Sequence, residues 1–300
     1  MNLVYCRLNP GNFGDELNPY LWPRLFPKAF SSDEAIDFLG IGTVLSPFVD
    51  RKGRRKIVFG TGAGYWRAPK IDDHWTIHFV RGPLTAQVLQ VPTQYAITDG
   101  AYCLTFVEEP PMTPSSAVVF MPHHKSEPEV DWRSLCADLG WTYASPTSDV
   151  RSSLSLLRSA KLVVTEAMHG AIVADIYRIP WIPIRYGFRS LDFKWQDWCS
   201  SMSLEYRPVD LPPLLDARLD ARETLERLIK KSAAVFGIGK DAWKATPVFR
   251  SSSKQRDDAL RTLARLSNGS VGFLSPEPAL ERVKAQLWDK VEHFRSSHER

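Results

Sequence analysis

The segment at residues 161–184, KLVVTEAMHGAIVADIYRIPWIPI, has two short apolar runs on either side of an alanine-rich stretch. The runs at 161–165 and 181–184 predict buried strands, and residues 168–178 between them predict a helix. Strands buried on both faces and separated by helices form parallel sheets. His169 stands where the first strand passes into the helix, at the end of the sheet where α/β proteins bind ligands. A buried core histidine is the alternative explanation, and the rest of the chain has to decide between the two.

The same alternation of strands and helices covers the first two thirds of the chain. In the first part we expect strands at 3–6, 37–41, 56–60, 76–80 and 95–98, with a helix at 83–89. In the second part we expect strands at 117–121 and 141–144, with helices at 131–139 and 149–159. The proline-rich acidic segment at 107–116 predicts a linker. The pattern indicates two facing Rossmann-like domains, at 1–110 and 117–204, followed by a helical tail at 205–300 with amphipathic stretches at 217–236, 254–266 and 276–294.

Composition narrows the class of function. The chain has 300 residues and a net charge of +4, with 44% hydrophobic and 24% charged residues, as in ordinary globular proteins. It has no lysine and arginine block with interleaved aromatics, so we expect no nucleic-acid partner, whereas small anionic substrates or an anionic membrane surface are compatible with the charge. The four cysteines lie too far apart for a metal-ligand pair and are typical of reduced cysteines. The amino terminus lacks signal-peptide features and no run is long enough to cross a membrane, so we expect a cytoplasmic protein.

Two glycine-containing loops follow strands of the first domain. The first, NPGNFGDELN, contains Asn12, Gly14 and Asp15. Its glycines permit close approach of the backbone to a ligand, and amides at a helix start bind anions. Asp15 either caps the helix or, if it faces the cleft, accepts a proton from a hydroxyl group. The second loop, FGTGAG, contains Gly62, and both a simple turn and a ligand-binding loop stay open for it.

Two charged residues stand at later strand ends of the same domain. Arg81, in FVRGPLTA, follows an apolar strand, where its guanidinium could hold a phosphate or carboxylate with two hydrogen bonds. A surface ion pair is the alternative for this arginine. Asp99, in ITDGAY, could orient Arg81, cap a turn or act as a base.

The second domain contributes a similar set. His123 and His124 end its first strand, and because adjacent side chains diverge on an extended strand, we do not expect them to bind a metal together. We expect one of them to face the cleft. Glu166 precedes His169, and Gly170 after it permits close approach of a ligand or another helix. Additional positive charge for the same cleft is available from Arg185, Arg189 and Lys194.

These motifs together resemble the polysaccharide pyruvyl transferase family, in particular its ketal-forming exopolysaccharide branch of the succinoglycan type. The resemblance spans roughly residues 11–198 and rests on GNFGDELNPYLWPRLF, FGTG, RGPLTA, TDGA, TEAMHGAIVAD with RIPWIPI, and FKWQDW. It implies an α/β fold of the GT-B-like kind, with the active site between two Rossmann-like domains with parallel sheets. It also implies phosphoenolpyruvate as donor and a hydroxyl pair on a lipid-linked oligosaccharide or other glycan as acceptor. Donor-binding positions of the family fall on Arg81 and on the motif that ends in His169.

This chain departs from the family at one position of that motif. Many members have Arg-Leu-His where this chain has Ala167, Met168 and His169. We expect Arg185 or Arg189 to replace the missing charge. The expected catalytic residues are His169, Asp15 and Asp99, and the expected substrate-binding residues are Arg81, Asn12, Gly14, Gly62, His123, Glu166, Met168, Gly170, Arg185 and Arg189.

Ketal formation requires an acid, a base and cations around a carboxylate and a phosphate. The expected chemistry demands no cofactor, metal ion or nucleotide beyond phosphoenolpyruvate itself. The inner face of the plasma membrane is a further expected contact. Two alternatives stay open: a GT-B glycosyltransferase that uses a nucleotide sugar, because fold alone does not set function, and a non-catalytic glycan-binding or assembly protein.

Overall fold

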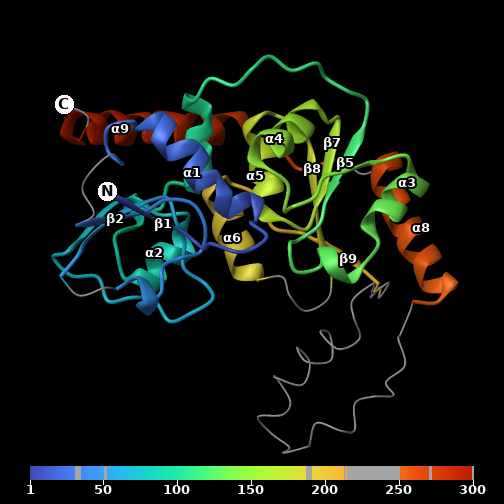
Figure 1. Ribbon diagram of the computed structural model, residues 1–300, viewed down its shortest axis with the longest axis horizontal. Helices are drawn as coiled ribbons and strands as arrows, with labels where there is room; N and C mark the ends of the chain where they lie inside the picture. The colour runs from blue at the N-terminus through green and yellow to red at the C-terminus, as the bar shows by residue number, and fades with distance from the viewer. Residues whose placement is uncertain are drawn as a thin grey trace, which may run out of the picture.

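The computed structural model describes residues 1–30, 35–50, 53–186, 191–212, 214, 251–269 and 272–298. These residues form two α/β lobes with helices α1 (Phe13–Leu25) and α5 (Met168–Ile176) between them (Figure 1). Each lobe contains one parallel sheet, which confirms the expected fold class. The helix expected at 217–236 lies outside the described residues. Within the described parts of the chain, no helix has both the length and the apolar composition needed to cross a membrane.

The first sheet has four parallel strands in sequence order. They are β1 (Asn2–Val4), β2 (Ile36–Leu39), β3 (Arg55–Phe59) and β4 (Trp75–Phe79), each within one or two residues of its expected place. The prediction of a fifth strand at 95–98 is wrong. A 3₁₀ helix, η2 (Thr93–Tyr95), occupies this region, and only a single bridge from Val80 to Ala96 extends the sheet. The N–H groups of Ala96 and Ile97 bond back to Thr93 and Tyr95, so they cannot join a ladder.

The second sheet has five parallel strands in the order β6-β5-β7-β8-β9. This is the 2-1-3-4-5 order of doubly wound folds, in which the strand order reverses between β5 and β7. The strands are β5 (Val118–Met121), β6 (Thr142–Tyr143), β7 (Leu162–Thr165), β8 (Trp181–Tyr186) and β9 (Val209–Leu211), the last of which we did not expect. Helices α3 (Trp132–Leu139) and α4 (Val150–Ser159) begin where the side chains of Asp131 and Asp149 accept backbone N–H groups.

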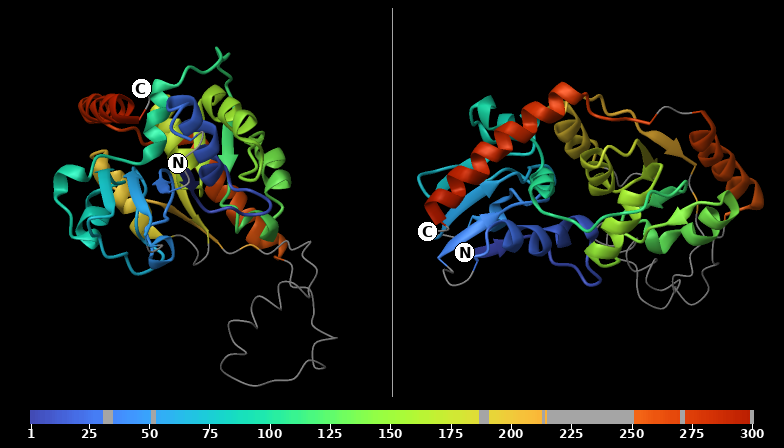
Figure 2. Two further views of the ribbon diagram at one scale, coloured as in Figure 1. Left: turned by 60° about the vertical axis from the view of Figure 1, so that its left-hand side comes forward. Right: turned by 90° about the horizontal axis from the view of Figure 1, so that it is seen from above.

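The chain after residue 190 is divided between both lobes. Helix α8 (Ser253–Gly269) packs with α3, and its Ala259 and Leu263 join the core of the second lobe. Helix α9 (Glu277–His298) instead lies along the first lobe, far from α8 (Figure 2). There the ring of Phe294 lies 4.4 Å from that of Phe26 and 5.4 Å from that of Phe59. The expected helical tail is therefore not a unit of its own, because each helix completes the core of a different lobe.

Helix α6 (Asp192–Ser201) also belongs to the first lobe by packing, where it contacts α2 (Pro83–Leu89). Helix α2 has the bounds expected from the sequence, with Pro83 in its first turn. The first lobe thus consists of residues from both ends of the chain.

A buried carboxylate ties the junction of the lobes together. Asp175 of α5 accepts hydrogen bonds from the hydroxyl of Tyr102 at 2.6 Å, from Trp181 Nε1 at 3.2 Å and from the backbone and hydroxyl of Ser275 at 2.7 and 2.6 Å. Tyr102 belongs to a 3₁₀ helix, η3 (Gly100–Phe106), in the first lobe. Because all of these donors would be unsatisfied without it, Asp175 fixes α5 against both η3 and the segment that leads into α9.

Candidate functional site

His169 lies at the start of α5, where the two lobes meet. Its side chain is 12% exposed. A Cβ atom on Gly14, at the start of α1, would collide with the imidazole ring, so only glycine permits this approach. The expected importance of Gly14 therefore has a physical reason, although its close contact is with His169.

Asp99 faces the same imidazole from the first lobe. Its carboxylate is fully buried, and its Oδ1 lies 3.6 Å from His169 Nε2. The same oxygen accepts the N–H of Ala101 at 3.0 Å, so the expected capping role is confirmed. Neither Asp99 Oδ2 nor His169 Nε2 has a hydrogen-bond partner among the described residues. An imidazole of the second lobe therefore faces a carboxylate of the first lobe.

Asp15 lies in the first turn of α1. The N-cap of the helix is Asn12, not Asp15, and Asn12 Nδ2 donates to Asp15 Oδ2 at 2.8 Å. Burial raises the pKa of the Asp15 carboxyl, while the Asn12 hydrogen bond and the charges of His169 and Lys194 lower it. Asp15 therefore shares its electrostatic environment with His169 and Lys194.

Glu166 follows β7 at the point where the strand order of the second sheet reverses. Its Oε2 accepts the backbone N–H of His123 at 2.9 Å and the hydroxyl of Ser126, which places it beside the end of β5. Burial raises the pKa of Glu166 to about 6, against the opposing effects of those hydrogen bonds and of Lys194. A carboxyl group with a pKa in this range can carry a proton near neutral pH.

Lys194 of α6 supplies positive charge between the lobes. Its Nζ lies 3.5 Å from the hydroxyl of Tyr65, and it lowers the pKa of both Asp15 and Glu166. The ammonium group of Lys125 lies over the Tyr65 ring from the second lobe, 5.8 Å from its centre. Tyr65 was not among the expected residues, since an aromatic residue after a glycine-rich loop carries no sequence signal for its neighbours.

The prediction that His123 and His124 diverge is wrong. Both follow the end of β5, outside the strand, and their rings lie 4.2 Å apart. Alternation applies only to extended strand residues. Burial lowers the pKa of His124 to about 4, which keeps its ring neutral. Across the ranges that the structure describes, no three His, Cys, Asp or Glu side chains are grouped to hold a metal ion.

Arg81 is not free to act as an anion clamp. Its side chain is fully buried, with Nε 3.0 Å from Asp197 Oδ2, Nη1 2.8 Å from Thr43 Oγ1 and Nη2 2.8 Å from the carbonyl oxygen of Ala63. A Cβ atom on Gly62 would collide with the guanidinium, so the FGTGAG loop encloses Arg81. The structure corrects the expected role of both Arg81 and Gly62, because the donors of this arginine already bind the protein.

Other expected contacts also have structural partners. Arg185 pairs with Asp210 at 2.6 Å and Asp192 at 3.0 Å, which opposes its expected use as a replacement cation. Met168 is buried in the core, and Gly170 is needed because a Cβ atom there would approach Thr165 Oγ1 to 2.7 Å. Arg189 lies outside the described residues.

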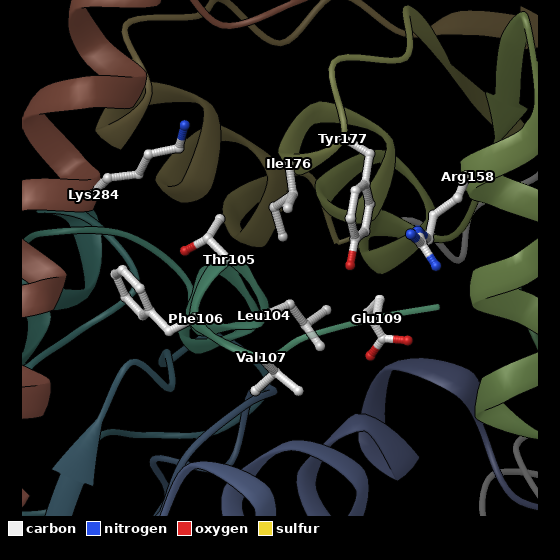
Figure 3. Close-up of a pocket in the computed structure, with 9 residues that line it drawn as sticks. All are labelled: Leu104, Thr105, Phe106, Val107, Glu109, Arg158, Ile176, Tyr177 and Lys284. Carbon is white, nitrogen blue, oxygen red and sulfur yellow. The ribbon is translucent and has the colours of Figure 1, made fainter. Parts of the chain in front are cut away.

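A separate cavity of about 390 Å³ lies at the other end of α5 (Figure 3). Ile176 and Tyr177 line it at the end of that helix, beside Arg158 of α4, whose guanidinium lies 4.8 Å from the centre of the Tyr177 ring, and Lys284 of α9 also lines it. Residues 104–107 and Glu109 of the linker region complete its wall. It shares no residue with the group around His169 and is a different place in the fold.

Two buried acids that organise the site region were missed from the sequence. Asp197 in FKWQDW and Asp175 in AIVADI both stand among apolar or aromatic residues. An acidic residue inside such a run signals a buried partner, because an unpaired buried charge is costly. That signal predicts the existence of a partner but does not identify it.

The buried pair predicts that Arg81→Met destabilises the fold. The substitution leaves the Asp197 carboxylate buried without its counter-ion, and we expect the free energy of unfolding to fall by about 3–5 kcal/mol. Urea unfolding followed by circular dichroism measures this change. Arg185→Met is the control, because its ion pairs are exposed and its loss should alter stability little. Equal stabilities of the two variants would contradict a structural role for Arg81.

The raised pKa of Glu166 predicts a pH dependence of stability. The pKa of Glu166 in the folded state, about 6, exceeds the reference value of 4.5. Its contribution to the free energy of unfolding is therefore present below pH 4.5 and is lost as pH rises through about 6. The unfolding free energy of the unmodified protein minus that of Glu166→Gln should therefore fall by about 2 kcal/mol across this window. Urea unfolding at a series of pH values checks it. A difference that stays constant with pH would show that burial does not perturb this carboxyl group.

The sequence of this chain is similar to a known family model and to a known protein. Residues 112–187 match the family model described as polysaccharide pyruvyl transferase. Over 215 residues, the chain is 34% identical to the succinoglycan biosynthesis protein ExoV of Rhizobium meliloti, covering 71% of this chain and 68% of that protein. The solved structure of KP1_0663 from Klebsiella pneumoniae, a functionally uncharacterised protein, aligns with a TM-score of 0.34 at 16% identity, covering 65% of this chain and 87% of that one. The shared length and identity with ExoV show that this chain belongs to the polysaccharide pyruvyl transferase family.

Proposed function

We propose that this transferase moves the pyruvyl group of phosphoenolpyruvate onto two hydroxyls of one sugar residue, forming a cyclic ketal and releasing phosphate. The observation that carries the proposal is the position of His169 3.6 Å from the Asp99 carboxylate, where His169 and Lys194 also act electrostatically on the Asp15 carboxylate. Acid–base groups and a cation are thus available to a single bound substrate.

The reaction balances with these groups. The methylene carbon of phosphoenolpyruvate takes up a proton, and one sugar hydroxyl forms a bond to the neighbouring carbon. The bond from that carbon to the phosphate oxygen then breaks, and phosphate leaves. The second hydroxyl bonds to the same carbon and closes the ring. The two sugar hydroxyls lose one proton each. One of these balances the proton that the methylene carbon takes up, and the other leaves with phosphate.

His169 is the proposed proton donor to the methylene carbon. An imidazole can both take up and release a proton, and the Asp99 carboxylate lies 3.6 Å from its Nε2. Asp15 is the proposed base for an acceptor hydroxyl, because burial raises its pKa and makes it a better proton acceptor than an exposed carboxylate.

Lys194 is the proposed counter-charge for the donor. Arg81 and Arg185 are engaged in ion pairs, whereas no described carboxylate forms an ion pair with Lys194. The first-turn N–H groups of α5 provide partial positive charge nearby. The proposal needs no cofactor, metal ion or nucleotide.

The acceptor is proposed to be an exopolysaccharide precursor. The relative ExoV is named for succinoglycan biosynthesis, and the family for polysaccharide pyruvyl transfer. A lipid-linked oligosaccharide at the inner face of the plasma membrane would present such hydroxyls to a cytoplasmic enzyme.

The proposed donor site predicts that Lys194→Met weakens phosphoenolpyruvate binding. Loss of one charge-assisted contact should raise the dissociation constant on the order of 10- to 100-fold. Calorimetric titration measures it, with Lys284→Met as the control because Lys284 lines the separate cavity. Parallel titration with nucleotide sugars should give no heat of binding. Binding of a nucleotide sugar without binding of phosphoenolpyruvate would instead support a glycosyltransferase.

The proposed acid predicts that His169→Asn folds but loses ketal formation. Removal of a general acid should lower the rate by about 10²- to 10⁴-fold. Acceptor-dependent phosphate release follows the reaction, and thermal melting checks the fold. His74→Asn, at an exposed position in the first lobe, is the matched control. Full activity of His169→Asn would refute the assignment, and unfolding of the variant would return His169 to the core.

A further inference from the structure

Exposed aromatic side chains gather at one edge of the first lobe. Phe48, Tyr65 and Trp66 are 72%, 46% and 61% exposed. They are three of the six large apolar residues of the described chain that are exposed, and we call them the aromatic platform. Phe48 follows β2, and Tyr65 and Trp66 follow β3. Because β1, β2 and β3 are parallel, the loops after them share the sheet edge at which Asn12 and Asp15 lie.

The platform is built by specific local structure. The rings of Phe48 and Trp66 pack edge to face, with centres 5.2 Å apart and planes at 89°. This geometry leaves at least one face of each ring uncovered by the other. Gly64, with φ of +155°, turns the chain just before Tyr65, and a Cβ atom there would approach Leu191 Cδ2 to 2.8 Å. The loop is thus held against the start of α6, with Tyr65 beside Lys194.

The platform is continuous with the candidate site. Tyr65 joins them, since its hydroxyl lies 3.5 Å from Lys194 Nζ while its chain neighbour Trp66 contacts Phe48. An occupant that starts in the region between the lobes and extends over the first lobe would therefore cross Tyr65 and Trp66. Exposed apolar patches beside a site are typical of ligand-binding surfaces.

We propose that the aromatic platform binds the neutral sugar rings of the acceptor that adjoin the reacting residue. Aromatic faces carry negative partial charge, and the C–H face of a pyranose ring carries positive partial charge, so the two stack. A polysaccharide precursor is longer than the one residue that reacts, and its other rings must lie beyond the reacting groups. This inference rests on the proposed function and adds where the acceptor binds and which residues hold it.

Neutral oligosaccharides provide a test that does not depend on catalysis. We would titrate the intact chain and its variants with cellotetraose, lactose and maltotetraose by calorimetry. Trp66→Ala should weaken binding by about tenfold, and Phe48→Ala should weaken it in the same direction. Trp288→Ala is the matched control, because Trp288 is the other exposed tryptophan described, at 45%, and packs on Phe106, which lines the separate cavity. Thermal melting should show no change for these surface variants.

The outcomes separate this inference from the proposed function. Equal affinity of Trp66→Ala and the unmodified protein for all three sugars, or no binding by either, would overturn the platform assignment. Loss of binding to phosphatidylglycerol vesicles in Trp66→Ala, with sugar affinity retained, would identify a membrane contact and also overturn it. Failure of the proposed function would appear elsewhere, as an unmodified protein that does not bind phosphoenolpyruvate. Trp66→Ala should bind phosphoenolpyruvate normally.

Discussion

The buried ion pair between Arg81 and Asp197 holds the site region together. Both side chains are fully buried, and the Asp197 carboxylate also accepts the N–H of Thr85 at 3.0 Å and its hydroxyl at 2.5 Å. Burying two charges is costly unless their hydrogen bonds are satisfied, and here they are. The pair joins residues 116 positions apart and anchors α6 in the first lobe. Because Lys194 precedes Asp197 by three residues on this helix, the same anchor places its ammonium group between the lobes.

The candidate site exists only where the lobes meet. His169 comes from the second lobe and Asp15 and Asp99 from the first, and the ring approaches closely because position 14 is glycine. The imidazole and the two carboxylates therefore come together only across the junction of the lobes. Asp175 supports this geometry from the other end of α5 through its bonds to Tyr102 and Ser275. The catalytic proposal and the acceptor proposal therefore both depend on how the lobes are joined.

The chain returns to the first lobe near its end, so this lobe also depends on residues far apart in the sequence. Phe294 of α9 packs among Phe26, Phe38 and Phe59, so the sheet of residues 2–79 is covered by residues near the end of the chain. Expected domain boundaries were contiguous in sequence, whereas the packed units are not. Amphipathic helices can be recognised from their own sequence, but the surface that each one covers depends on its partners.

Local order was determined by the sequence alone. The strand β7, the helix α5 and the strand β8 follow from apolar runs of the right length, and α2 begins at Pro83 because proline suits a first helical turn. Asp99 as a cap was also predictable, since its hydrogen bond to the N–H of Ala101 spans two residues.

The tertiary structure decided which charged side chains are bound to partners within the protein and which can contact a substrate. Arg81 and Arg185 bind Asp197 and Asp210, whereas Lys194 faces the site. Helix and turn signals come from interactions within a few residues, but the partner of a charged side chain is set by long-range packing, which local pattern does not encode.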